Sequence, residues 1–269
     1  MEQKLIALDL DGTTLNNESQ INPKTESVLK QAQTAGHIVT IVTGRPNKLA
    51  LNYYDQLNLT TPMINFNGSL GFIPHQQWGQ EYELTFNKRI AFNILNNKHE
   101  LGIKVMAAEG KNFALADVPN DVLGGYFPAG KKSTDILNKM NLQKDPTSMM
   151  LLVDPTRKEE TVTKLENEFG DKITVSVWGG PNPVLEISPK GINKEYGVRY
   201  LANYFNISRK NIIAFGDEHN DTEMLSFAGW GVAMKNGTND IKNIANDVTT
   251  LDNDHDGLAY YLEDYLKLA

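Results

Sequence analysis

Asp9 and Asp11 lie two positions apart directly after an apolar stretch near the start of the chain, and Gly12 follows them. Side chains two residues apart point the same way in an extended backbone, and glycine permits the sharp turn that must come next. A third carboxylate, Asp217, comes just after another apolar stretch, at residues 212–215. Three acids that converge without histidine or cysteine favour a hard cation, with Mg²⁺ ahead of Ca²⁺ where the protein supplies few ligands. The sequence therefore predicts a magnesium site at Asp9, Asp11 and Asp217.

Residues that can bind a phosphoryl group also lie at or just past the ends of predicted strands. Thr43 supplies a hydroxyl group, Lys194 an ammonium group and Asn220 an amide, and the backbone around Leu10 offers N–H groups. Cationic and hydrogen-bonding donors of this kind hold the charge of a phosphoryl group during its transfer. These residues therefore predict phosphoryl transfer.

One of the carboxylates is then free to attack phosphorus. A carboxylate nucleophile forms an acyl phosphate, which a water molecule activated by a neighbouring base can hydrolyse. We expect Asp9 to be the nucleophile and Asp11 to act first as acid and then as base. Each segment alone could be a polar turn or a helix N-cap. Their order along the chain, each after an apolar strand, favours the catalytic interpretation.

The apolar pattern that carries these residues alternates between strands and helices. Leu5 to Leu8 is apolar throughout, as in a parallel-sheet strand that is covered on both faces. A helix after the strand predicted at residues 37–42 is expected to bury Leu49, Ala50, Tyr53 and Leu57. Further strands are predicted at residues 37–42, 63–66, 212–215 and 230–233, and further helices at residues 193–205, 220–227 and 258–266. Ligands bind at the carboxyl ends of strands in open parallel sheets, so the polar segments are expected to meet at one site.

The pattern changes between residues 84 and 187, where short strands and helices alternate with scattered glycine and proline. We interpret this stretch as a separate α+β domain inserted into the domain that holds the parallel sheet. The predicted domains are a discontinuous core at residues 1–83 and 188–269 and an inserted domain at residues 84–187. A chain of 269 residues is long enough for both.

Composition argues against several other classes of protein. Hydrophobic residues make up 40% and charged residues 22%, as in globular domains. The formal net charge of −7 and the lack of a basic run argue against nucleic-acid and anionic-lipid partners. There is no cysteine, which excludes disulfides and thiolate chemistry. We read no signal peptide and no stretch of the ~18 apolar residues that a membrane span requires. A cytoplasmic protein with a small-molecule substrate is expected.

The polar segments together resemble motifs one to four of the haloacid dehalogenase superfamily: Asp9-Leu10-Asp11-Gly12-Thr13-Thr14, Thr43, Lys194 and Gly216-Asp217-Glu218-His219-Asn220-Asp221. The segments at residues 185–194 and 217–234 resemble its Cof-type hydrolases with a class IIB cap. The resemblance covers essentially the whole chain. Glu195 and Gly237 depart from the pattern, where glycine and alanine are commoner, but neither carries a proposed chemical group.

The resemblance implies a Rossmann-like core, an inserted α/β cap and Mg²⁺-dependent hydrolysis of small phosphorylated metabolites, often sugar phosphates. On that pattern Asp9 and Asp217 bind the metal through their side chains and Asp11 binds it through its backbone carbonyl. The residues that hold the phosphate on the same pattern are Thr43, Gly44, Lys194 and Asn220.

Three neighbours of these motifs have less specific expectations. Arg45 could reach a phosphate or hydroxyl group of the substrate, or it could pair with a surface acid. Asp221 is expected to support the metal site through a water molecule or to cap a helix. His219 is expected to be a solvated loop residue, since Mg²⁺ rarely selects histidine.

Other functions use related residues. A phosphomutase would form the same aspartyl phosphate and return the phosphate to a sugar, and only the cap could distinguish it. A receiver domain also places aspartate, threonine and lysine at strand ends, but about 120 residues suffice for it, and its paired acids and acceptor would lie on different strands. A binding protein without activity would be expected to have lost a motif residue, whereas all are present. Hydrolysis is therefore the predicted reaction.

Overall fold

The computed structural model describes residues 2–118, 133–178 and 182–268. The chain divides into two compact units. Met1–Tyr82 and Asn193–Ala269 form one, which we call the core unit, and Glu83–Ile192 form the other, the inserted unit. Within the described ranges no helix is long and apolar enough to cross a membrane.

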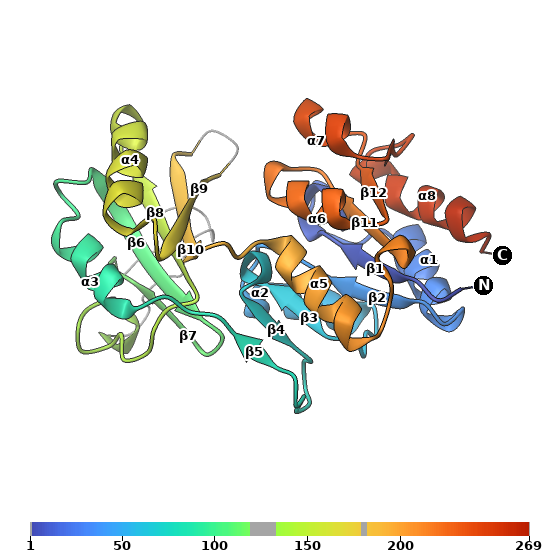
Figure 1. Cartoon of the computed structure of the whole chain (residues 1–269), viewed down its shortest axis with the longest axis horizontal. Helices are drawn as coiled ribbons and strands as arrows, with labels where there is room; N and C mark the ends of the chain where they lie inside the picture. The colour runs from blue at the N-terminus through green and yellow to red at the C-terminus, as the bar shows by residue number, and fades with distance from the viewer. Residues whose placement is uncertain (1, 119–132, 179–181, 269) are drawn as a thin grey trace. The chain divides into compact units, whose positions relative to one another are not determined.

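The core unit is built on a five-stranded parallel sheet with the strand order β13-β12-β11-β1-β2 (Figure 1). The strands are β1 (Leu5–Leu8), β2 (Ile38–Ile41), β11 (Ile212–Gly216), β12 (Trp230–Ala233) and β13 (Asp247–Val248). The register places Leu8 of β1 beside both Ile41 of β2 and Phe215 of β11. The carboxyl ends of β1, β2 and β11 are therefore level with one another, which confirms the predicted parallel α/β class.

A second, smaller sheet extends the core unit. It has the order β3-β4-β5, with β3 (Met63–Asn65), β4 (Leu70–Phe72) and β5 (Tyr82–Glu83). A parallel bridge between Val42 and Ile64 joins the end of β2 to β3. This bridge brings the turn after β3, Phe66–Gly68, close to the residues that follow β2.

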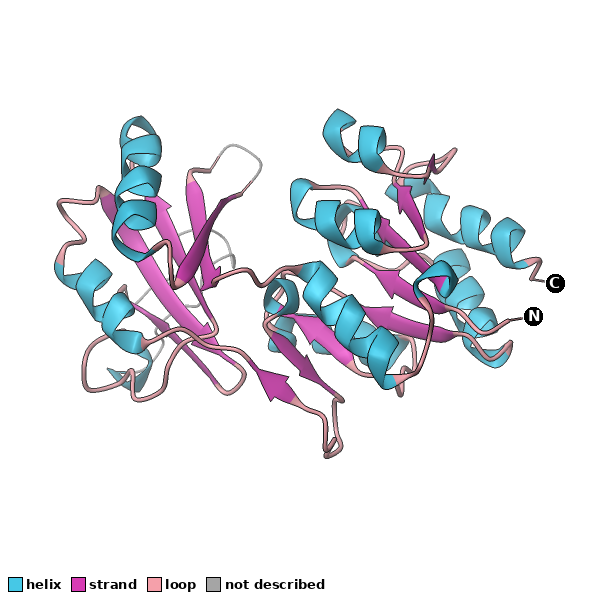
Figure 2. Ribbon diagram, in the orientation of Figure 1, coloured by secondary structure: helices cyan, strands magenta, loops and turns pink. Residues whose placement is uncertain are grey.

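Helices cover both faces of the parallel sheet (Figure 2). The helices of the core unit are α1 (Pro23–Thr34), α2 (Asn47–Gln56), α5 (Lys194–Tyr204), α6 (Thr222–Phe227), α7 (Asn239–Ile244) and α8 (Gly257–Leu266). Ile6 and Leu8 of β1 belong to the apolar cluster that contains α1, α2 and α8, whereas Leu5 and Ala7 belong to the cluster that contains α5, α6 and α7. Alternate side chains of a strand point to opposite faces, so a strand that is apolar throughout is buried on both.

The order of the strands reverses between β1 and β11. The helix that follows β1, α1, covers one face of the sheet, and the helix that follows β11, α6, covers the other. The loops that leave the two neighbouring strands therefore diverge and expose the strand ends between them. Ligands of open α/β sheets bind at such a switch point, and Asp9 and Asp217 are the residues directly after β1 and β11.

The inserted unit has an antiparallel sheet with the order β7-β6-β8-β10-β9. Its elements are β6 (Ile103–Gly110), β7 (Phe113–Ala116), β8 (Ser148–Val153), β9 (Ile173–Val177), β10 (Val184–Pro189), α3 (Lys88–Asn96) and α4 (Lys158–Phe169). Both helices pack on one face of the sheet, in a cluster that includes Met106, Met149 and Leu185. The opposite face carries a smaller apolar cluster with Ala107 and Met150.

The helix predicted to bury Leu49, Ala50, Tyr53 and Leu57 forms as α2, but one of the four positions was wrong. Leu49 is 53% exposed. The buried stripe is set by Ala50, Tyr54 and Leu57, at the spacing i, i+4, i+7 of one helix face. The four apolar residues lie on two adjoining faces of the helix. Packing against the sheet buries only one of these faces, and the sequence does not show which.

Candidate active site

Asp9 and Asp217 meet at the carboxyl ends of two paired strands. Asp9 follows Leu8, the last residue of β1, and its backbone N–H donates to the carbonyl of Phe215 at 3.1 Å. Asp217 follows the last residue of β11. Both carboxylates are buried. The parallel register of β1 and β11 thus places the two acids side by side, as the sequence predicted for a site at this edge.

The tight turn at Leu10–Thr14 packs directly against Asp217. Gly12 has φ +68, and a Cβ atom added there would lie 2.2 Å from Oδ2 of Asp217. The hydroxyl of Thr13 donates to Oδ1 of Asp217 at 2.9 Å, and the hydroxyl of Thr14 donates to the carbonyl of Asp9 at 2.5 Å. Glycine is therefore required at residue 12 both for its backbone conformation and for the space that Asp217 fills.

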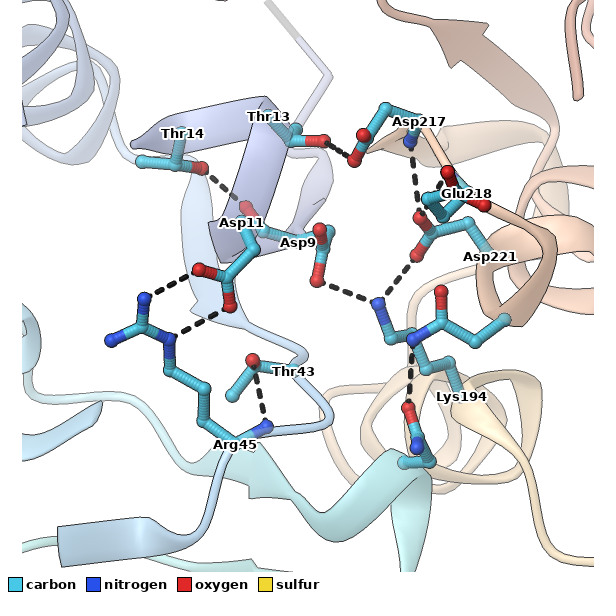
Figure 3. A network of polar contacts seen from close by, with 12 residues as sticks. Asp9, Asp11, Thr13, Thr14, Thr43, Arg45, Lys194, Asp217, Glu218 and Asp221 are labelled. Carbon is cyan, nitrogen blue, oxygen red and sulfur yellow. Dashed lines mark hydrogen bonds and ion pairs between the residues drawn. The ribbon is translucent and has the colours of Figure 1, made fainter. Parts of the chain in front are cut away.

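Lys194 joins the two sides of the site from the start of α5. Its Nζ lies 2.6 Å from Oδ1 of Asp9 and 2.6 Å from Oδ1 of Asp221, and its side chain is fully buried. Asn193 caps this helix by accepting a hydrogen bond from the N–H of Tyr196. Figure 3 shows Asp9 and Lys194 between the segment with Thr43 and the segment with Asp217 and Asp221.

Asp221 organises the loop after β11. Its Oδ2 accepts hydrogen bonds from the backbone N–H groups of Asp217, at 3.0 Å, and Glu218, at 3.2 Å. The side chain of Glu218 accepts from the backbone N–H of Asp221 in return, which completes a capping box at the short helix His219–Asp221. Asp221 therefore caps this helix, one of the two expectations from the sequence, and in addition binds Lys194. His219 is exposed, as expected.

The electrostatics of the cluster favour a cation. Burial raises the pKa of Asp9 well above its usual range, although the ammonium group of Lys194 opposes the effect. Burial, together with the carboxylate of Asp221, raises the pKa of Asp217 to about 7. Burial alone would lower the pKa of Lys194, but the carboxylates of Asp221 and Asp9 raise it above its ordinary value. Three buried acids surround one ammonium group, so the ionised cluster has more negative than positive charge and attracts a further cation.

A divalent metal ion fits this environment. Oxygens of Asp9, Asp217 and Asp221 all lie within 4.8 Å of one another, and a hard cation such as Mg²⁺ is bound through carboxylate oxygens. The side chain of Asp11 lies outside this cluster and is 59% exposed. Of the residues in the sequence prediction, Asp9 and Asp217 thus contribute side chains to the acidic cluster, and Asp221 supplies the third.

Asp11 is held by Arg45. The guanidinium Nε donates to Oδ2 of Asp11 at 2.7 Å, and Nη2 contacts Oδ1 (Figure 3). Arg45 also donates to the hydroxyl of Tyr53 at 3.3 Å and lies over its ring. Hydrogen bonding to Asp11 raises the pKa of Arg45 further above its ordinary value. The acid that Arg45 pairs with is therefore part of the first motif and not an unrelated surface residue.

The remaining predicted residues surround the same strand ends. Thr43 is buried two residues beyond β2, and its hydroxyl accepts from the N–H of Arg45 at 3.1 Å. Gly44 packs against the amide of Asn67, and Asn220 donates to Oδ1 of Asn67 at 3.1 Å. The side chain of Leu10 is buried in the core, so its backbone is the part that a ligand can contact.

Two asparagines of this region had no role in the sequence prediction. Asn67 lies in the turn Phe66–Gly68, and its Oδ1 accepts from Asn220. Asn236 donates to the carbonyl of Gly12 at 2.7 Å and accepts from the N–H of Asn253 at 3.1 Å, so it ties the first loop to the C-terminal part of the chain. No short motif marks these residues, because both act through the fold of distant segments. The Asn-Gly pair directly after the third strand was the signal available for Asn67.

Comparison with known proteins gives a consistent result. A model of the haloacid dehalogenase-like hydrolase family matches residues 6–262. The chain is 36% identical over 278 residues, with 100% of each chain covered, to 5-amino-6-(5-phospho-D-ribitylamino)uracil phosphatase YitU of Bacillus subtilis. It is 28% identical to phosphatase YwpJ of the same organism, with 98% of this chain and 100% of the relative covered.

Solved structures agree with these sequence relatives. A crystal structure from Thermotoga maritima is 26% identical, with a TM-score of 0.80 and 97% of each chain covered. The structure of a haloacid dehalogenase subclass IIB sugar phosphatase has a TM-score of 0.79 at 21% identity, with 99% of this chain and 100% of that chain covered. The likeness to the sugar phosphatase structure shows a shared fold alone.

The burial of Asp217 predicts a gain in stability when its charge is removed from the metal-free protein. A carboxyl whose pKa is raised in the folded state stabilises the fold at a pH below its unfolded value of about 3.9, and this contribution is lost as the pH rises through about 7. Asp217→Asn keeps an acceptor for Thr13 but carries no charge. We expect it to raise the Tm at pH 8 by on the order of 2–5 °C, and by less at pH 5.

The measurement is scanning calorimetry in EDTA at both pH values. Asp264→Asn is the matched control, because Asp264 is exposed and pairs only with Lys267 among the described contacts. A lower Tm for Asp217→Asn at pH 8, or a gain of equal size at both pH values, would contradict the electrostatic account of the site.

Proposed function

We propose, from the premise that this chain belongs to the haloacid dehalogenase-like hydrolases, that it hydrolyses small phosphorylated metabolites through a phospho-aspartate on Asp9. The family and the phosphatase activity that the sequence predicted are confirmed by the family model and by the named phosphatases to which the chain is similar. The observation that carries the site assignment is the buried contact of Lys194 with Asp9, at 2.6 Å, beside Asp217. It supports a carboxylate that is fixed in place and surrounded by groups suited to a phosphoryl dianion.

In the first step an oxygen of Asp9 attacks phosphorus while the bond from phosphorus to the leaving oxygen breaks. Lys194, already bound to Asp9, offsets the negative charge that approaches the nucleophile. The hydroxyl of Thr43, the backbone at Gly44 and the amide of Asn220 would bind the other phosphoryl oxygens. Asp11 gives its proton to the leaving alcohol, for which its carboxyl must leave Arg45.

In the second step water attacks the phosphorus of the acyl phosphate, and the bond between phosphorus and Asp9 breaks. Asp11 takes the proton from this water, and inorganic phosphate leaves. The exposed position of Asp11 suits this role, because the residue must meet both the leaving alcohol and the incoming water. Arg45 contacts both oxygens of the Asp11 carboxyl and so fixes the orientation of this side chain when no substrate is bound.

The metal we propose is Mg²⁺. The side chains of Asp9 and Asp217 and the backbone carbonyl of Asp11 would hold it, with Asp221 beside them. When bound, the ion would offset the charge of these carboxylates and of the phosphoryl group.

The metal dependence can be tested directly. EDTA should abolish turnover, and added Mg²⁺ should restore it, because without the ion the phosphoryl group would enter a cluster of three buried acids. The measurement is release of inorganic phosphate after dialysis against EDTA, with and without added Mg²⁺. Full activity in protein shown by elemental analysis to be metal-free would contradict the proposed site.

The substrate we propose is a phosphorylated sugar or polyol. Two relatives support this class: the 36% identical protein is named as a phosphatase of a phosphoribitylamino compound, and a protein of the same fold is named as a sugar phosphatase.

We further propose that the inserted domain, residues 84–187, selects the leaving group. A panel of sugar phosphates, polyol phosphates and 5-amino-6-(5-phospho-D-ribitylamino)uracil should show highest kcat/KM within this class. Phosphate transferred within the sugar instead of released would indicate a mutase.

Replacement of the two acids of the first motif should separate their roles. Asp9→Asn removes the attacking oxygen anion, so turnover should vanish and no phosphoenzyme should form. Asp11→Asn keeps the nucleophile but lacks the acid and the base, each of which contributes roughly 10²–10⁴-fold. With acetyl phosphate, whose leaving group needs no proton, the Asp11→Asn protein should form the phosphoenzyme and then accumulate it.

Intact mass spectrometry after an acid quench detects the added phosphate. Turnover by Asp9→Asn, or a phosphoenzyme that forms on Asp9→Asn and not on Asp11→Asn, would show that the two roles are assigned wrongly.

A further inference from the structure

The turn after β3 has an uncommon backbone. Phe66, Asn67 and Gly68 all have positive φ, at 50°, 51° and 105°. A positive φ is tolerated by glycine and asparagine but is an outlier for a bulky residue such as phenylalanine. Such strain persists only where the surrounding structure over-determines the backbone, and it concentrates at functional sites. The turn lies beside the strand ends that carry the acids, because it contacts the loops after β2 and β11.

Three hydrogen bonds fix the turn to the loop after β2. The N–H of Asn67 donates to the carbonyl of Thr43 at 3.1 Å, and the N–H of Phe66 donates to the carbonyl of Arg45 at 3.3 Å. The side chain of Asn65 donates to the same carbonyl at 3.0 Å. The backbone of the loop that carries Thr43, Gly44 and Arg45 is therefore held by hydrogen bonds from residues 65–67.

The side chain of Asn67 reaches the second phosphate-binding segment. Its Oδ1 accepts a hydrogen bond from Nδ2 of Asn220 at 3.1 Å. The same oxygen would lie 3.0 Å from a Cβ atom added at Gly44, so the amide packs on the backbone there. Asn67 thus contacts both Gly44, after β2, and Asn220, after β11.

We propose that Asn67 is a positioning residue that orients the amide of Asn220 toward the phosphoryl group. This inference rests on the proposed function. A carbonyl oxygen can only accept, so Asn67 binds the NH₂ end of the Asn220 amide and leaves its second N–H to donate elsewhere. Without Asn67 the amide of Asn220 can rotate and present its oxygen to an anionic phosphoryl oxygen, which is repulsive. Asn67 therefore acts on phosphate affinity through Asn220.

Asn67→Gly is the variant that tests the proposal, because glycine adopts the positive φ of residue 67 and lacks the amide. Asn58→Gly is the matched control: Asn58 also has a positive φ, at 50°, but it is exposed after α2. We expect Asn67→Gly to lower kcat/KM by roughly tenfold, about the effect of one hydrogen bond, mainly through a higher KM. Asn58→Gly should match the wild type, and calorimetry should show Asn67→Gly folded at the assay temperature.

A double-mutant cycle with Asn220→Ala tests whether Asn67 acts through Asn220. In the Asn220→Ala background, Asn67→Gly should change kcat/KM by no more than about twofold. A full tenfold effect in that background, or an Asn67→Gly single variant equal to the wild type, would overturn the proposal.

Binding of inorganic phosphate separates this inference from the proposed function. With Mg²⁺ present, titration calorimetry should show roughly tenfold weaker phosphate binding by Asn67→Gly than by Asn58→Gly. If the wild type is active, Asp9→Asn is inactive and Asn67→Gly has an unchanged affinity for phosphate, the role of Asn67 is contradicted while the proposed function stands. A wild type that releases no phosphate from any ester would instead contradict the proposed function.

Discussion

The buried ion pairs of Lys194 are the constraint on which the core unit depends. Its ammonium group lies 2.6 Å from carboxylate oxygens of both Asp9 and Asp221 and has no exposed surface. Loss of one partner from a buried pair is typically destabilising by about 3–5 kcal/mol, because it leaves a charge without compensation. The N-terminus of α5, the end of β1 and the loop after β11 must therefore stay together. β1 precedes the inserted unit and the other two elements follow it, so the arrangement that fixes the proposed nucleophile also joins the two halves of the core unit.

The two acids of the first motif lie in opposite environments, and this difference supports their proposed roles. Asp9 is buried and bound to Lys194, so its carboxylate is held in one position, as a nucleophile requires. Asp11 lies in the turn that follows, largely exposed, with Arg45 as its partner. A side chain that exchanges protons with a leaving group and then with water needs access to both. The i, i+2 spacing would place both carboxylates together on an extended backbone, but the turn Leu10–Thr14 begins directly after Asp9, so the two side chains diverge.

Much of the core unit could be predicted because its signals are local. A strand such as Leu5–Leu8, buried on both faces, is apolar throughout, and Asp9 and Asp217 follow such strands directly. By contrast, β4, β5 and β13 have only three, two and two residues, too few to show a pattern of their own. The link from Asn67 to Asn220 and the link from Asn236 to Gly12 join positions 153 and 224 residues apart, and their partners are set only when the sheet has formed. The acidic cluster shows the same limit, since Asp221 joins it through the geometry of the loop after β11.

The segment before α8 shows why spacing must be read together with geometry. Asp252, Asp254, Asp256, Gly257 and Glu263 have the spacing of a calcium-binding loop, in which alternate acids and a final glutamate converge on one ion. In this fold the four carboxylates diverge. Asp252 accepts from the N–H of His255, Asp254 from Asn17, Asp256 from Thr25, and Glu263 pairs with Lys24. Asp252 thus contacts a residue of its own segment, and the other three acids contact different parts of the chain that follows β1. The three acids of the candidate site, in contrast, converge.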